Sequence, residues 1–416
     1  MASAVERVVV VGAGQGGFQV AASLRALGFG GTITLVGDET GLPYQRPPLS
    51  KTFLVENRSD KLLFRPRQFF VDNDITVLEG QRVEEIDRTT QNVRLANGEE
   101  LPYDHLVLAT GTRNRPLPIE GADLDNVVEL RTLAHAENVS KRLRDAKRVV
   151  VVGGGFIGLE LATATARLGA DVTVFEAAHR LMARAVSLPI SDRFQYLHER
   201  MGVRVRLRTT LAAIHGDKDG RVRGVETSDG SKERADLVIV GIGVVPNVEL
   251  AERAGLACEN GVVVGDTMLT DDPNISAIGD CASHIDSRSN ARLRLESVQN
   301  AADQAKVVAA RLTGKPYPYT DIPWFWSDQA GAKLQIAGLA TDGDSTLVVG
   351  HPDDTSPMHV ITFKNDAMTA VEAVDAPAQY MAGRRLLEGE AVSRSDVERA
   401  AGDLREVMKA QRARAA

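Results

Sequence analysis

Cysteine is scarce in this chain, which has only two, Cys258 and Cys281, among its 416 residues. Two thiols cannot build a disulfide framework, and an iron–sulfur cluster needs about four cysteine ligands. The two cysteines also lack the close spacing of a redox-active pair. We therefore expect a reduced protein without a metal site, whose chemistry does not pass through its own sulfur atoms.

The chain also lacks long apolar runs and an excess of positive charge. No stretch approaches the roughly 18 consecutive apolar residues of a membrane span, and no N-terminal signal segment is expected. With 49 basic against 56 acidic residues the net charge is −7, which argues against a nucleic-acid-binding surface. We expect a cytoplasmic protein of two or three domains whose partners include neither nucleic acid nor membrane.

Glycine, by contrast, is frequent, and two glycine-rich turns are near-copies of each other. RVVVVGAGQGG (Arg7–Gly17) and RVVVVGGGFIG (Arg148–Gly158) each follow a short β-branched run and open a segment with helical apolar spacing. A further strand follows each helix, with the sequences TITLVGDE and ADVTVFEA. The repeat covers about 30 residues and predicts a β-turn-α-β unit at both places.

Each position in such a glycine turn has its own physical role. The first glycine permits the tight bend, the second lets the backbone approach a pyrophosphate, and the third lets helix and strand pack closely. The N–H groups and the dipole at the start of the helix favour phosphate binding. Two copies therefore predict two bound dinucleotides, one at Gly12, Gly14 and Gly17 and the other at Gly153, Gly155 and Gly158.

An acidic residue after each turn is expected to accept hydrogen bonds from a ribose. Glu176 ends the strand VTVFE, and its charge would repel a 2′-phosphate, which favours NADH over NADPH. Arg180 and Arg184 stand nearby and could accommodate that phosphate. After the first turn the strand-end position is Gly37, so the acid expected at the ribose is Asp38, one position later.

The rest of the chain supplies further strands and domain crossings. DHLVLATG, RADLVIVGIGVVPN and NISAIGDCA predict buried strands that end in tight turns, and the Pro-rich RNRPLPIEG is an expected crossing between domains. KLQIAGLA, STLVVG, MHVITFK and AMTAVEAV predict an antiparallel sheet. The last residues, DVERAAGDLREVMKAQRARAA, are expected to be a solvated helix or a frayed tail.

These patterns predict an α/β protein with two Rossmann-like dinucleotide-binding domains and an α+β C-terminal domain that carries an antiparallel sheet. The predicted boundaries place residues 1–113 and 245–320 in the first domain. The second domain takes residues 114–244, and the C-terminal domain takes residues 321–416.

Seven motifs in combination carry a resemblance to a known family. The chain resembles, over nearly its whole length, the FAD-dependent and NADH-using ferredoxin reductases of bacterial cytochrome P450 and aromatic-ring dioxygenase systems. The motifs are LPYQRPPLSK (Leu42–Lys51), LVLATG (Leu106–Gly111), FIGLE (Phe156–Glu160), GIGVVPN (Gly241–Asn247), AIGDCA (Ala277–Ala282), LESVQNA (Leu295–Ala301) and PWFWSDQ (Pro323–Gln329).

The resemblance implies a glutathione-reductase-like fold, with FAD at the first glycine turn and NADH at the second, where Arg184 joins Glu176 as a candidate contact. Asp280, at a strand end, is expected beside the ribityl hydroxyls of FAD, and its alternative role is a helix N-cap. The residues that the resemblance places against FAD are Gly16, Asp38, Lys51, Val83, Arg131, Asp280 and Val298.

The resemblance also implies three candidate catalytic residues. Lys51 and Glu160 look like the pair near the reactive edge of the flavin, where an ammonium group stabilises developing negative charge. The alternative is an exposed lysine and an ordinary helix-face glutamate. Trp324 and Trp326 share one face if they lie on a strand. The resemblance favours Trp326 beside the flavin, and core packing is the alternative.

The absence of a cysteine pair bears on function. Flavoprotein disulfide reductases pass electrons through two cysteines beside the flavin, whereas GLPYQRPPLSKTFL has none. The flavin must then deliver electrons directly to an external acceptor, which the resemblance identifies as a [2Fe–2S] ferredoxin serving a P450 or a dioxygenase. No triad or metal spacing is visible at His179, His198 and His284, which are expected to be structural or surface residues.

Three other functions stay open on the sequence. Rubredoxin reduction and monodehydroascorbate-type reduction use the same scaffold. A protein of the apoptosis-inducing type would use bound FAD and NADH to govern association more than turnover. The oligomeric state stays open between a monomer and a weak dimer.

Overall fold

The computed structural model describes residues 5–415, which fall into two units. The first comprises residues 5–45, 59–113 and 244–321, and the second comprises residues 46–58, 114–243 and 322–415. Among the helices of this described range, none combines the length and apolar character that a membrane crossing requires.

A five-stranded parallel sheet forms the centre of the first unit, in the order β19-β7-β1-β2-β3. The β-branched run after the N-terminus forms the middle strand β1, and β7 is buried along its whole length, as expected for a sheet covered on both faces. The strands are β1 (Arg7–Val11), β2 (Thr32–Val36), β3 (Ile75–Leu78), β7 (His105–Leu108) and β19 (Ile275–Ala277).

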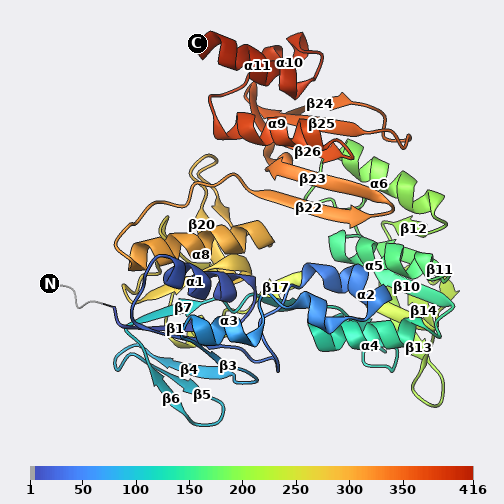
Figure 1. Cartoon of the computed structure of the whole chain (residues 1–416). Helices are drawn as coiled ribbons and strands as arrows, with labels where there is room; N and C mark the ends of the chain where they lie inside the picture. The colour runs from blue at the N-terminus through green and yellow to red at the C-terminus, as the bar shows by residue number, and fades with distance from the viewer. Residues whose placement is uncertain (1–4, 416) are drawn as a thin grey trace. The chain divides into compact units, whose positions relative to one another are not determined.

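Two long helices of this unit lie side by side, α1 (Gln15–Ala26) directly after β1 and α8 (Val298–Leu312) near the end of the unit (Figure 1). An antiparallel sheet of three strands interrupts the unit between β3 and β7. The remaining elements are β4 (Val83–Asp87), β5 (Asn92–Leu95), β6 (Glu100–Pro102), β8 (Thr112–Asn114), β17 (Val244–Pro246), β18 (Val262–Val263), β20 (Ala282–Ile285), β21 (Arg292–Leu293), α3 (Arg67–Asp72), α7 (Glu249–Arg253), η2 (Ser59–Leu62) and η3 (Gly279–Cys281).

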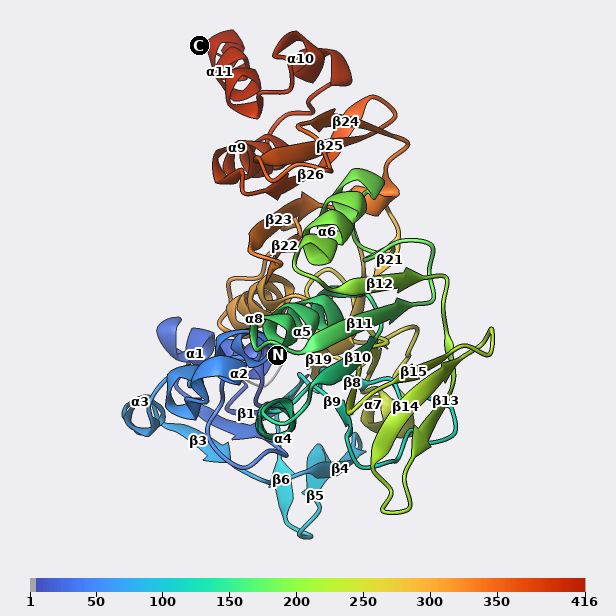
Figure 2. The same cartoon turned by 90° about the vertical axis from the view of Figure 1, so that its right-hand side faces the viewer.

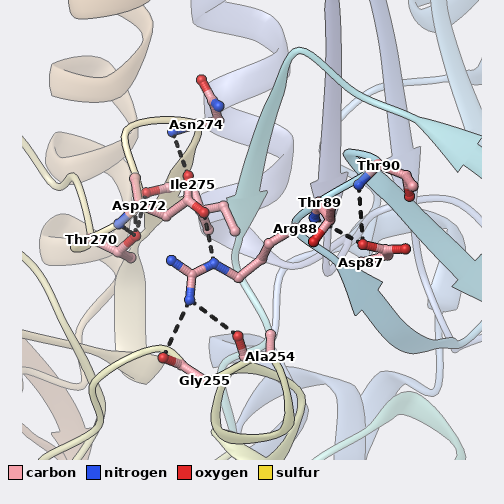
Figure 3. Close-up of polar contacts among 10 residues, drawn as sticks. All are labelled: Asp87, Arg88, Thr89, Thr90, Ala254, Gly255, Thr270, Asp272, Asn274 and Ile275. Atoms are coloured by element: carbon pink, nitrogen blue, oxygen red, sulfur yellow. Dashed lines mark hydrogen bonds and ion pairs between the residues drawn. The ribbon is translucent and has the colours of Figure 1, made fainter.

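Arg88, directly after β4, anchors this small sheet to the rest of the unit (Figure 3). Its Nε donates to Asp272 Oδ2 at 2.7 Å, and its Nη1 donates to the carbonyls of Ala254 and Gly255 at 3.2 and 3.3 Å. Asp272 is itself held, because its Oδ1 accepts from the backbone N–H of Asn274. One guanidinium thus joins three segments that are far apart in sequence.

The second unit repeats the architecture of the first. Its five-stranded parallel sheet has the order β12-β11-β10-β16-β9, and a three-stranded antiparallel sheet again lies between the third and fourth strands of the repeat (Figure 2). The strands are β9 (Val127–Glu129), β10 (Arg148–Val152), β11 (Asp171–Glu176), β12 (Arg204–Leu207), β13 (Leu211–Gly216), β14 (Val222–Thr227), β15 (Lys232–Arg234) and β16 (Leu237–Val240). The internal repeat is therefore much longer than the 30 residues visible in sequence.

The antiparallel sheet predicted near the C-terminus is confirmed, with the strand order β22-β23-β26-β25-β24. Helix α9 (Pro377–Glu388) packs on β23 and β26, and α11 packs on α9 (Figure 1). The strands are β22 (Trp324–Gln329), β23 (Ala332–Gly338), β24 (Ser345–Val349), β25 (Met358–Lys364) and β26 (Ala367–Val374). The other helical elements of this unit are η1 (Pro47–Ser50), α2 (Thr52–Glu56), α4 (Leu133–Leu143), α5 (Phe156–Arg167), α6 (Leu188–Arg200), η4 (Ala340–Asp342), α10 (Arg394–Arg399) and α11 (Leu404–Ala415).

The C-terminal segment is helical, as one of the two expectations had it, but it is neither fully solvated nor frayed. Val397 on α10 and Leu404 and Val407 on α11 are buried in the same apolar cluster as Phe363 of β25. These three apolar residues are separated in sequence by charged ones, so the apolar stripe is not evident from composition. The stripe completes the core beside the C-terminal sheet.

Replacing Leu404 by alanine should lower the free energy of unfolding by about 2–5 kcal/mol, because a fully buried leucine leaves a cavity. Chemical denaturation of the purified protein measures the change. Lys409→Ala is the matched control on the same helix, since Lys409 is exposed and should change stability by less than about 0.5 kcal/mol. Equal stability of Leu404→Ala and the native protein would restore the frayed tail.

Candidate functional site

The first glycine turn divides its glycines between packing and access. Gly12 has φ +109°, and a Cβ built there would lie 2.1 Å from the carbonyl oxygen of Ala109. A Cβ at Gly17 would lie 1.8 Å from the carbonyl oxygen of Gly12. At Gly14, the N-cap of α1, no atom of the described structure lies within 4 Å of such a Cβ. A side chain therefore has no room at Gly12 or Gly17. At Gly14, which is expected to meet a pyrophosphate, the space is open.

The second turn has the same arrangement. Gly153 has φ +108°, and a Cβ built there would lie 2.3 Å from the carbonyl oxygen of Gly241. A Cβ built at Gly158 would lie 2.2 Å from the carbonyl oxygen of Gly153. Gly155, the N-cap of α5, is open like Gly14. Within the described residues no side chain caps either helix, so both N-termini fit a phosphate group.

Glu176 stands at the predicted place beside the second turn. Its Oε2 accepts from the backbone N–H of Gly154 at 2.6 Å, and its Oε1 accepts from that of Ala178 at 2.7 Å. Each carboxylate oxygen has a second lone pair for a ribose hydroxyl. The two backbone N–H groups hold the Glu176 carboxylate in one position. The predicted discrimination against a 2′-phosphate would therefore come from a charge with a fixed location.

The displaced acid of the first turn has a steric explanation. Gly37 is the structural counterpart of Glu176, because Gly12 donates to Val36 in the same way as Gly153 donates to Phe175. A Cβ at Gly37 would lie 2.7 Å from the Cβ of Ala13, whereas the counterpart of Ala13 is Gly154. The acid therefore moves to Asp38, which is exposed.

The two arginines near Glu176 differ in availability. The Arg180 guanidinium donates to the carbonyl oxygens of Val186 and Ala183, both at 2.8 Å, and so braces its own loop. Arg184 is exposed, and its Nη2 would lie 3.2 Å from a Cβ built at Gly243. Of the two, Arg184 is the one with a head group at the surface.

The other residues predicted to contact FAD are divided between the two units. In the first unit, the Thr112 hydroxyl donates to the Asp280 carboxylate at 3.3 Å, and Val298 is the first residue of α8. Val83 is buried in the core, so only its main chain remains for a ligand. Gly16 packs closely against Ile278. The alternative N-cap role of Asp280 is wrong, because Ile278 is the N-cap of η3.

Arg131 and Lys51 belong to the second unit. The carbonyl of Arg131 accepts from the Arg46 guanidinium at 2.6 Å. Arg46 precedes η1, the short helical turn that ends at Ser50 and packs against α4 and α5. The Arg46–Arg131 hydrogen bond and the packing of η1 on α5 bring Lys51 next to α5.

Lys51 and Glu160 form an ion pair of 3.1 Å between Nζ and Oε1. The Glu160 carboxylate is 6% exposed and also accepts from two hydroxyls, Ser50 at 2.5 Å and Ser327 at 2.6 Å. Lys51 further lies 3.9 Å from the Asp328 carboxylate. The alternative of an exposed lysine and an ordinary helix-face glutamate is wrong, because the Glu160 side chain is buried and paired with Lys51.

The two tryptophans share one face of β22 as predicted, with ring centroids 5.7 Å apart. Trp324 packs against the C-terminal core, with the Arg384 guanidinium 5.2 Å from its ring. Trp326 is half-buried and contacts Phe325, whose ring lies 4.5 Å from that of Phe156 on α5. Core packing thus accounts for Trp324, and the role predicted for Trp326 stays a prediction.

Comparison with known proteins agrees with this geometry. Residues 6–305 match the family of pyridine nucleotide-disulphide oxidoreductases, and residues 324–408 match the reductase C-terminal domain. The chain belongs to the pyridine nucleotide-disulphide oxidoreductase family. It is an oxidoreductase that uses FAD and NAD(P)H.

Individual relatives match over almost their whole length. Rhodocoxin reductase of Rhodococcus erythropolis is 48% identical over 384 residues, which cover 92% of this chain and 90% of that protein. The solved ferredoxin reductase for the CYP199A2 system from Rhodopseudomonas palustris is 43% identical with a TM-score of 0.93, covering 97% of this chain and 100% of its own. The reductase in a covalent putidaredoxin reductase–putidaredoxin complex is 37% identical with a TM-score of 0.94, covering 98% and 99%. The predicted resemblance is confirmed.

This pyridine nucleotide-disulphide oxidoreductase differs from the disulfide reductases in its thiols. Both cysteines are free, and Cys281 is fully buried. Burial raises the pKa of the Cys258 thiol to about 11 and also raises that of Cys281. Since the thiolate is the reactive form, neither thiol suits an electron relay.

Gly37→Ala should lower the free energy of unfolding by about 1–3 kcal/mol and reduce the FAD retained on purification, because the new methyl group overlaps Ala13. Thermal unfolding and flavin absorbance measure the two effects. Adding Ala13→Gly should restore both, since it recreates the small-residue pairing of the second turn. A Gly37→Ala protein that matches the native one would contradict the steric account.

Proposed function

We propose that the chain takes hydride from NADH onto FAD and passes single electrons to a [2Fe–2S] ferredoxin that supplies a cytochrome P450 or a ring-hydroxylating oxygenase. One combination carries this proposal: two glycine turns of the dinucleotide-binding type occur in a chain whose two cysteines lack the close spacing of a redox-active pair. Relatives named ferredoxin reductases support the choice of acceptor. FAD supplies the conversion from a paired-electron donor to a single-electron donor.

The first turn would hold FAD and the second would hold NADH. At the first, the N–H groups of α1 would bind the pyrophosphate, with Gly16, Asp38, Asp280 and the main chain of Val83 beside the nucleotide. The other proposed FAD contacts are Lys51, Arg131 and Val298. At the second, Glu176 would accept from the ribose and Arg184 would lie at the edge of the site.

Lys51, Glu160 and Trp326 are the proposed catalytic residues. The Lys51 ammonium would stabilise negative charge that develops on the reacting ring. Glu160 holds that ammonium through a buried ion pair, and the hydroxyls of Ser50 and Ser327 compensate its desolvation. Trp326 would cover the site from β22 and exclude water.

The domain assignment follows from these roles. We assign residues 1–113 and 245–320 to the FAD-binding domain, 114–244 to the NADH-binding domain and 321–416 to the C-terminal domain. Within the first range, residues 46–58 belong to the second structural unit. We also propose that the protein works in the cytoplasm, which two free thiols support, since a reducing compartment keeps thiols unpaired.

Oxidation of NADH by the FAD-loaded protein should be slow alone and should rise steeply on addition of a [2Fe–2S] ferredoxin, because the described residues include neither a redox-active cysteine pair nor a metal-binding cluster that could take electrons from the flavin. Steady-state absorbance of NADH measures the rate. A rubredoxin in parallel tests the competing acceptor. Failure of every small iron–sulfur or iron carrier to accelerate the reaction would favour the alternative of a binding protein.

Glu176→Gln should raise kcat/KM for NADPH relative to NADH by about tenfold, because the substitution removes a fixed charge from the place of the 2′-phosphate. Kinetics with each nucleotide measure the ratio. Glu39→Gln is the matched control. Glu39 lies after the strand of the first turn, and its carboxylate accepts a hydrogen bond from the Tyr44 hydroxyl, so the nucleotide ratio should not change. An unchanged ratio in Glu176→Gln would contradict the assignment.

A further inference from the structure

The buried carboxylate of Glu160 lies at the end of a chain of side-chain hydrogen bonds that starts on α6. Ser327 Oγ donates to Glu160 Oε1 at 2.6 Å, and Gln329 Nε2 donates to Ser327 Oγ at 3.1 Å. Gln329 Oε1 in turn lies 3.0 Å from His198 Nε2. Glu160, Ser327, Gln329 and His198 are all at most 6% exposed. Three elements, α5, β22 and α6, thus meet in one polar line inside the second unit.

The direction of each hydrogen bond in this line can be assigned. Met182 Sδ lies 3.6 Å from Gln329 Nε2, and because sulfur accepts but does not donate, it favours the amide nitrogen on that side. Gln329 Oε1 then faces His198, where an oxygen can only accept. His198 must donate from Nε2.

The protonation of His198 agrees with this direction. Burial lowers the pKa of His198 to about 4, so the ring is neutral near pH 7 and carries a single N–H. His198 Nδ1 has no hydrogen-bond partner within the described structure, which suits a ring nitrogen without hydrogen. The proton on Nε2 therefore orients the Gln329 amide, and the amide orients the Ser327 hydroxyl toward Glu160.

A reversed amide would break the line. Gln329 would then accept from Ser327, the hydroxyl proton would point away from Glu160, and one of the two hydroxyl donors of the buried carboxylate would be lost. Since a buried charge is costly without its hydrogen bonds, the direction set at His198 matters at Glu160.

We propose that Ser327 and Gln329 are positioning residues for the Lys51–Glu160 pair, with His198 as the group that sets the direction of their hydrogen bonds. The inference rests on the proposed function, because it takes the pair to act in hydride transfer. Ser50, which donates to the other oxygen of Glu160, lies outside this line.

A double-mutant cycle in the full-length, FAD-loaded protein tests the proposal. Ser327→Ala and Gln329→Leu should each slow flavin reduction by NADH about tenfold, through kcat with KM unchanged. Because Gln329 acts only through Ser327, the double variant should be no slower than Ser327→Ala. The double variant Ser50→Ala/Gln329→Leu should instead be slower than either single variant, since Ser50 donates to the other oxygen of Glu160 and lies outside the line.

Thr163→Val is the matched structural control. Thr163 Oγ1 accepts from the Ala330 N–H at 2.9 Å, so it also joins α5 to the end of β22 without touching Glu160. This variant should lower the unfolding midpoint by a few degrees and leave the rate of flavin reduction unchanged. If it slows the reaction as much as Gln329→Leu, packing explains the effect and the proposal is overturned.

A second readout is independent of activity. Nitrogen-15 NMR of histidine-labelled protein should show His198 as the neutral Nε2–H tautomer at pH 7. The tautomer should persist in Ser327→Ala and be lost in Gln329→Leu. A native His198 protonated on Nδ1, or rates in both variants equal to the native rate, would overturn the proposal. Failure to reduce any ferredoxin would overturn only the proposed function, since neither readout involves that partner.

Discussion

In each dinucleotide-binding half of this protein, a close approach between two glycines leaves no room for a side chain. The carbonyl oxygen of Gly12 occupies the place of a side chain at Gly17, and that of Gly153 does the same at Gly158. This approach lets a helix begin directly at the edge of a parallel sheet, with its N–H groups pointing outward. Together with the open space at Gly14 and Gly155, this close approach makes each half suitable for a pyrophosphate.

One difference between the two halves falls on a pair of neighbouring positions beside each glycine turn. One has alanine at 13 and glycine at 37, and the other has glycine at 154 and glutamate at 176. A Cβ at Gly37 would lie 2.7 Å from that of Ala13, and a Cβ at Gly154 would lie 2.6 Å from the Leu181 side chain and 3.1 Å from the Glu176 carboxylate, so one member of each pair is glycine. The same backbone thus offers a fixed carboxylate beside one turn and an exposed one beside the other, which gives the two sites different nucleotide contacts.

The second organising feature is the buried carboxylate of Glu160. The groups that compensate the burial of this charge come from segments far apart in sequence. Ser50 and Lys51 precede α5, the helix of Glu160, and Ser327 follows it. A buried ion pair contributes little net stability, since desolvation offsets the attraction. What the ion pair gives in this fold is a fixed location for the Lys51 ammonium. A long-range requirement of this kind leaves no periodic signal.

Local pattern determined much of this protein. The glycine turns, the strands beside them and the antiparallel C-terminal sheet were predictable, because each depends on residue type at short spacing. The Lys51–Glu160 pair was predicted only through the resemblance to a known family. The alternation in WFWSDQ also indicated that Trp324 and Trp326 share a face. Tertiary structure decided the rest: that this face meets α5, that His198 reaches it from α6, that Ala13 excludes an acid at Gly37, and that α11 is buried. Those outcomes depend on which surfaces pack together, and packing partners distant in sequence are not encoded in the period of any single segment.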